Sequence, residues 1–108
     1  MTLTKDAKTL LYSLYKEYSD RRKHGFSKID SKKFGSAKSI QESFFPKIPL
    51  PDIEDSLREL DRNDFLVNFY ADDTIYDCAL SDYAIATLED LPKETLLSIA
   101  DFISKFIP

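Results

Sequence analysis

The sequence predicts an α+β fold in which a helix runs directly into a two-stranded hairpin. Apolar residues recur at i, i+4 and i+7 on one helical face: Ile53, Leu57 and Leu60. Two β-rich runs follow at residues 65–70 and 75–80, and the short polar segment 71–74 joins them. Between the helix and the first run, Asn63 is expected to supply a left-handed stop.

The chain before this unit predicts two more helices with a short strand between them. A first helix is expected to begin after the N-cap Thr4 and to end at Gly25. Residues 26–30 are compatible with a brief strand that pairs with the hairpin. A second helix spans residues 36–45 and is ended by proline, and Pro51 suits the first position of the helix that follows.

The hairpin and the segment after it predict specific faces. Alternation places Phe65, Val67 and Phe69 on one face of the first strand, and Leu66, Asn68 and Tyr70 on the other. In the second strand, Tyr76, Cys78 and Leu80 are expected to share a face. A short helix over residues 81–88 then has three apolar anchors: Tyr83, Ile85 and Leu88.

A last helix is predicted over residues 92–106, and its apolar positions extend well beyond one stripe. A helix of this kind must bury more than one side, either on the first helix or against another subunit. We therefore expect a homodimer. The dimerisation residues expected on this helix are Leu96, Ala100, Ile103, Phe106 and Ile107.

A chain of 108 residues forms one domain, with a core at residues 4–88. The chain has no apolar run of the roughly 18 residues that span a bilayer, and no signal-peptide pattern at its start, so we expect no membrane partner. The single cysteine, Cys78, excludes an internal disulfide and favours a cytoplasmic location. With two glycines and no motif for nucleotides or metals, the chain is expected to bind no cofactor and no metal.

The residues that carry a family resemblance lie around the hairpin. Residues 53–60 (IEDSLREL) and 63–66 (NDFL) resemble the passage from recognition helix to wing strand in the winged helix-turn-helix superfamily. Residues 80–85 (LSDYAI) resemble the start of the helix after the wing. The pattern is similar to that of small proteins of Gram-positive bacteria and their phages. It implies a transcription-regulator-like protein or a mobile-element accessory factor that binds double-stranded DNA.

Charge argues against the usual DNA-binding mode of that family. Residues 1–50 carry a net charge of +6, whereas residues 51–108 carry −10. The helix that would enter the major groove has Arg58 and Arg62 as candidate contacts to base edges, but acidic residues surround them. DNA affinity depends on Lys and Arg at the phosphates. The candidate phosphate contacts lie in the first half of the chain: Arg21, Arg22, Lys23, Lys28, Lys32, Lys33 and Lys38.

Two interpretations therefore stand side by side. In one, the basic residues dock DNA in a non-standard way. In the other, the scaffold binds a protein partner, with Asp55 and Glu59 as candidate surface residues. Catalysis is not expected, because His24 and Cys78 are the only histidine and cysteine and fit a solvated and a buried structural position.

Overall fold

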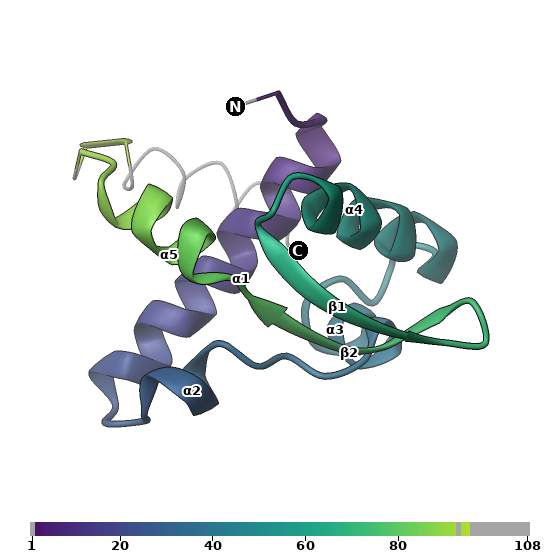
Figure 1. Ribbon diagram of the computed structural model, residues 1–108, viewed down its shortest axis with the longest axis horizontal. Coiled ribbons are helices and arrows are strands. Elements are labelled where there is room, and N and C mark those ends of the chain that lie inside the picture. The colour runs from purple at the N-terminus through teal and green to yellow at the C-terminus, as the bar shows by residue number, and fades with distance from the viewer. Residues whose placement is uncertain (1, 93, 96–108) are drawn as a thin grey trace.

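The computed structural model describes residues 2–92, 94 and 95, and these residues form an α+β fold (Figure 1). Within this part of the chain, helices precede and follow one antiparallel β-hairpin. The elements in chain order are α1 (Lys5–Lys23), α2 (Lys28–Ser31), α3 (Ala37–Phe44), α4 (Leu50–Arg62), β1 (Leu66–Ala71), β2 (Thr74–Leu80) and α5 (Asp82–Glu89). Within the described residues, the order predicted from the sequence is confirmed except at the predicted first strand. The helix predicted over residues 92–106 lies outside them, apart from residues 92, 94 and 95.

Most helices begin where a hydroxyl side chain caps them. Thr4, Ser27, Ser36 and Ser81 each accept a hydrogen bond from the backbone N–H three residues later, which satisfies a donor that the helix leaves open. Helix α4 differs, because Pro49 precedes it and provides no side-chain cap. Its first residue is Leu50, so it begins one residue earlier than expected.

The strand expected at residues 26–30 is wrong. A single helical turn, α2, forms there because the Ser27 hydroxyl accepts a hydrogen bond from the Asp30 N–H. The chain reaches the hairpin a few residues later instead, through a bridge between Lys33 and Ala79. Hydrogen bonds from Phe34 N–H to the Cys78 carbonyl and from Leu80 N–H to the Lys32 carbonyl, both 2.9 Å, complete this pairing.

The stop between α4 and β1 also differs from the prediction. Asn63 has φ −102°, whereas Asp64 has φ +66° and takes the left-handed conformation expected of Asn63. The Phe65 N–H then donates to the Leu60 carbonyl at 2.9 Å. A short polar side chain tolerates this conformation, so an Asp can serve where glycine is common.

A β-bulge changes the faces of the second strand. Asp72 and Asp73 form the turn with φ +52° and +60°, as a two-residue hairpin turn of the mirror type requires. The register then shifts opposite Phe69 and Tyr70, and Tyr76 becomes the extra residue. Ile75 therefore lies on the buried side with Cys78 and Leu80, and Tyr76 is 55% exposed, so the predicted alternation is wrong at Tyr76.

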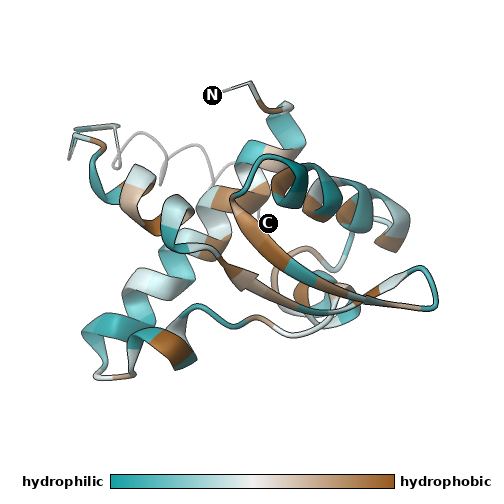
Figure 2. Ribbon diagram, in the orientation of Figure 1, coloured by the Kyte–Doolittle hydropathy of each residue, from teal (hydrophilic) through white to brown (hydrophobic). Residues whose placement is uncertain are grey.

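The core lies where α1, α3 and α5 meet α4 and the inner face of the hairpin. In Figure 2 the apolar colour runs along β1 and recurs on α4 and α5. Of the anchors predicted on α5, Ile85 and Leu88 are buried. Tyr83 is 57% exposed, and its ring lies beside that of Phe65, with 5.3 Å between the ring centroids. Ala84 takes the buried position instead.

The expected dimerisation residues fall on the last part of the chain: Leu96, Ala100, Ile103, Phe106 and Ile107. All of them lie outside the described residues, so the dimer stays a prediction. Among the residues that are described, no helix combines the length and the apolar character needed to cross a bilayer.

Candidate interaction surfaces

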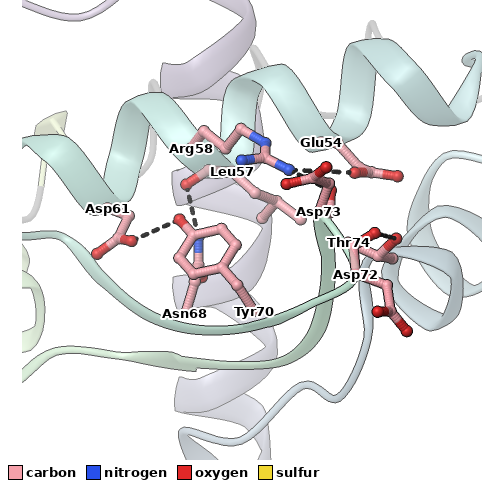
Figure 3. Close-up of polar contacts among 9 residues, drawn as sticks. All are labelled: Glu54, Leu57, Arg58, Asp61, Asn68, Tyr70, Asp72, Asp73 and Thr74. Atoms are coloured by element: carbon pink, nitrogen blue, oxygen red, sulfur yellow. Dashed lines mark hydrogen bonds and ion pairs between the residues drawn. The ribbon is translucent and has the colours of Figure 1, made fainter.

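Arg58 is held between α4 and the hairpin turn (Figure 3). Its guanidinium donates to the Asp73 carbonyl at 2.6 Å and lies 3.8 Å from the Glu54 carboxylate. The same group lies over the Tyr70 ring, 5.1 Å from its centroid. These contacts engage the guanidinium group, which an arginine needs in order to bind the edge of a guanine. Arg58 therefore fastens the hairpin turn to α4 in this conformation.

Two further side chains of β1 reach α4 beside Arg58 (Figure 3). The Tyr70 hydroxyl donates to the Asp61 carboxylate at 2.6 Å, and the Asn68 amide donates to the Leu57 carbonyl at 3.0 Å. Burial and the bond to Asp61 raise the pKa of Tyr70. We call the set of Arg58, Asp61, Asn68, Tyr70 and Asp73 the α4–hairpin clamp.

The rest of the α4 surface is acidic. Asp55 is exposed, as predicted for a partner-facing residue, and Asp52 is exposed one turn earlier. Glu59 instead accepts two hydrogen bonds of 2.7 Å from the N–H and hydroxyl of Thr4. Burial alone would raise the pKa of Glu59, but these bonds and the nearby Arg62 lower it. Glu59 thus joins α4 to the start of α1, and Arg62 is the exposed cation at the end of α4.

Most basic residues of the first half lie at the end of α1, in α2 and in the segment directly after it, and we call this region the basic corner. Its residues are Arg21, Arg22, Lys23, Lys28, Lys32 and Lys33. Lys38 lies apart from them, in the first turn of α3, which packs on α4 and β2. In Figure 1, α2 and the end of α1 lie on the left and the hairpin turn lies on the right. The end of α1 and α2 are therefore far from the hairpin turn, whereas Lys33, which pairs with Ala79 of β2, lies beside the hairpin.

Arg21 is a structural residue of this corner. Its guanidinium donates to the carbonyls of Ser31 and Lys33, at 3.2 and 2.7 Å. It also bonds Glu17 at 3.2 Å and lies 4.8 Å from the centroid of the Phe34 ring. These contacts hold the segment after α2 against the last turn of α1, so the charge of Arg21 is already used.

Three more cations of the corner have partners. Lys28 and Lys32 each lie 3.5 Å from the Asp82 carboxylate at the start of α5. Both ammonium groups lower the pKa of Asp82, and Lys28 has the larger effect. Arg22 donates to the Phe26 carbonyl at 3.1 Å. The side chains of Lys23, Lys33 and Lys38 are exposed and form no ion pair with any described residue.

The outer face of the hairpin carries exposed apolar side chains, and we call it the hairpin outer face. Val67, Phe69 and Tyr76 are 46%, 48% and 55% exposed, and the last two rings lie 6.3 Å apart. Val67 and Phe69 share the face that alternation predicted for them. Tyr76 joins them only because of the bulge, and alternation alone could not place it there.

The candidates for covalent chemistry, His24 and Cys78, differ in burial. His24 is exposed after α1, where its Nδ1 lies 2.7 Å from the Asp20 carbonyl. Cys78 is buried in β2, and burial, with the carboxylates of Asp77 and Asp61, raises the pKa of its thiol to about 12. A thiol in this state is not a nucleophile at neutral pH. In the part of the chain that the structure describes, no three His, Cys, Asp or Glu residues gather to hold a metal.

No protein-family model matches this chain, and no curated protein or solved structure is significantly similar to it. Inferences about function therefore rest on the contacts and charges of the α4–hairpin clamp, the basic corner and the hairpin outer face.

Proposed function

We propose that the chain is a winged-helix domain. The order of α1, α3, α4 and the hairpin supports this assignment, as does the backbone pairing of Lys33 with Ala79 beside the hairpin. In such a domain α4 is the recognition helix and the turn at Asp72 and Asp73 is the tip of the wing.

We further propose that this domain acts by binding a protein partner and does not read DNA with α4. The observation that carries the proposal is the position of Arg58. The hairpin turn and Glu54 already bind its guanidinium, and the exposed residues Asp52 and Asp55 lie along the same helix. Insertion of α4 into a groove would bring these carboxylates towards the phosphates, and Arg62 would be the only cation of α4 outside the clamp to offset them.

The partner surface in this proposal is the hairpin outer face. Val67 and Phe69 of β1 and Tyr76 of β2 form an exposed apolar patch, and Asp77 follows Tyr76 in β2. Exposed apolar and aromatic side chains with a polar rim are typical of the centres of protein interfaces. Because all three side chains come from one hairpin, the patch does not need a conformational change to form.

Affinity capture from the producing cells, followed by calorimetry with the purified partner, tests this proposal. We expect Phe69→Ser to weaken the Kd at least about tenfold, since buried aromatic anchors dominate interface energies. Lys23→Glu, in the last turn of α1 and far from the hairpin turn, is the matched control and should change the Kd less than about twofold. Equal binding by wild type and Phe69→Ser would contradict the assigned surface.

A second candidate function, with a regulator-like role, is binding of double-stranded DNA through the basic corner and Lys38. The exposed side chains of Lys33 and Lys38, which form no ion pair with a described residue, favour it. The test is the affinity of the Lys33→Glu/Lys38→Glu variant for a labelled duplex at low salt. Loss of binding supports this docking, and an unchanged affinity excludes it, because each lost phosphate contact lowers both affinity and salt dependence.

A further inference from the structure

A pocket opens between the N-terminal halves of α1 and α4 and the loop that joins α3 to α4. Its volume is about 290 Å³. The floor is apolar, because Leu10, Phe45 and Ile53 line it and each is at most 5% exposed. This volume lies close to the lower end of the range for small-molecule sites, roughly 300–1,000 Å³. The pocket is separate from the hairpin outer face and from the basic corner.

The loop side of the pocket is held in place before any ligand arrives. Pro46 and Pro49 restrict the backbone of residues 45–49. The Gln41 amide donates to the Ile48 carbonyl at 2.7 Å, and the Ile48 N–H donates to the Phe45 carbonyl at 3.1 Å. Ile48, which lines the pocket, is thus fixed from both sides. A preformed wall lowers the entropy that binding would otherwise cost.

The charges around the pocket favour a cation. Two exposed carboxylates, Asp6 and Asp52, line it, and Lys47 carries the one positive charge among the described lining residues. The start of α4 offers little to an anion. Pro51 has no N–H, and the N–H groups of Asp52 and Ile53 donate to the Pro49 carbonyl at 3.0 and 3.2 Å.

The Ser56 hydroxyl of the pocket wall is available to a ligand. The Ser56 hydroxyl lines the pocket, its residue is 8% exposed, and it forms no hydrogen bond with a described residue. The other hydroxyl of the wall, on Thr9, already donates to the Lys5 carbonyl at 3.0 Å. Ser56 can therefore accept a hydrogen bond from an ammonium group that the carboxylates attract.

We propose that this pocket binds a small organic cation of about nine non-hydrogen atoms, in which an apolar body carries a primary ammonium group. The apolar body rests on Leu10, Phe45 and Ile53. The ammonium group lies towards Asp6 and Asp52 and donates to Ser56. The proposal does not depend on the protein contacts proposed above, because none of these residues belongs to the hairpin.

Phenethylamine is the probe, and its titration into the ¹⁵N-labelled full chain is followed by amide chemical shifts. We expect saturable shifts at Leu10, Ile48 and Ser56 with a Kd of about 1–10 mM, the affinity typical of so small a ligand. The neutral analogue 2-phenylethanol should bind at least about threefold more weakly, because it lacks the charge. No shift at the pocket at about 20 mM, or equal affinity for both compounds, would overturn the proposal.

Charge variants separate a specific site from a nonspecific apolar depression. Asp52→Asn should weaken phenethylamine binding about two- to fivefold, whereas Lys47→Ala should strengthen it by a similar factor. Asp55→Asn removes an exposed carboxylate on the same helix that does not line the pocket, and it should leave the Kd unchanged. Similar effects of Asp52→Asn and Asp55→Asn, or weaker binding by Lys47→Ala, would contradict the assigned geometry.

Discussion

The α4–hairpin clamp and the basic corner use their arginines in the same way but leave different charges at the surface. Arg58 and Arg21 each donate to backbone carbonyls and lie over an aromatic ring. Around Arg58 the exposed groups that remain include the carboxylates Asp52 and Asp55, whereas around Arg21 they include the lysines Lys23 and Lys33. A count of charges therefore overstates what each surface offers to a partner, because both arginines already hold the fold together.

The largest effect is expected at the basic corner. Arg21→Ala should lower the free energy of unfolding by about 2 kcal/mol, because two carbonyl bonds and the contact with Phe34 are lost together. Urea unfolding followed by circular dichroism measures it. The control is Lys33→Ala, whose side chain is exposed and which should change the stability by less than about 0.5 kcal/mol. Equal effects of the two variants would show that Arg21 is not a structural residue.

A smaller effect is expected at the clamp. Arg58→Ala should cost about 1 kcal/mol, since its side chain is more exposed than that of Arg21 and solvent screens its pair with Glu54. Hydrogen exchange should also become faster at amides of the hairpin turn, because the Asp73 carbonyl loses its donor. Arg62→Ala, one turn later, serves as the control. Unchanged exchange at the turn in Arg58→Ala would contradict the fastening role.

The smallest effect concerns the pair of lysines on Asp82. Lys28 and Lys32 lower the pKa of Asp82 in the folded state below its ordinary value. The stabilisation is therefore present above that ordinary value and is lost as the pH falls through the folded pKa. The Tm of wild type should exceed that of Asp82→Asn slightly at about pH 6, and the difference should vanish by about pH 2.

Salt and a second variant check this prediction. About 1 M salt should also reduce the difference, because the Asp82 side chain is exposed. Asp72→Asn changes an exposed turn residue whose positive φ asparagine tolerates, and it should show no such pH dependence. A Tm difference for Asp82→Asn that persists at low pH would point to a cause other than its charge.

Local patterns in the sequence predict most of the fold. The periodicity of α1 and α4, the Thr4 cap and the Asp–Asp turn depend on neighbouring residues, and the sequence predicts each of them. It does not predict the caps at Ser27, Ser36 and Ser81. The sequence does not predict the turn of α2, because so short a segment carries too little periodicity to separate strand from helix. It does not predict the bulge at Tyr76, because alternation assumes a regular register. The left-handed residue is Asp64 and not Asn63, since both residue types tolerate this conformation.

The candidate surfaces were harder to predict because they depend on long-range contacts. Asp55 is exposed as expected, but Glu59 and Arg58 bond residues that lie far away in the sequence or across the hairpin turn. Nothing in the local sequence links Glu59 to Thr4. The pairing of Lys28 and Lys32 with Asp82 is also nonlocal, and it reduces the basic residues that remain open to a phosphate.

Fluorescence anisotropy of a labelled random 30-mer duplex, titrated with wild type and with Asp55→Lys at about 50 mM salt, measures whether α4 repels DNA. If α4 presents a repulsive acidic face, Asp55→Lys should bind the duplex several-fold more tightly than wild type, because it removes a negative charge and adds a positive one. Micromolar binding by wild type that Asp55→Lys abolishes would instead show that α4 contacts DNA through Asp55, and it would contradict the account.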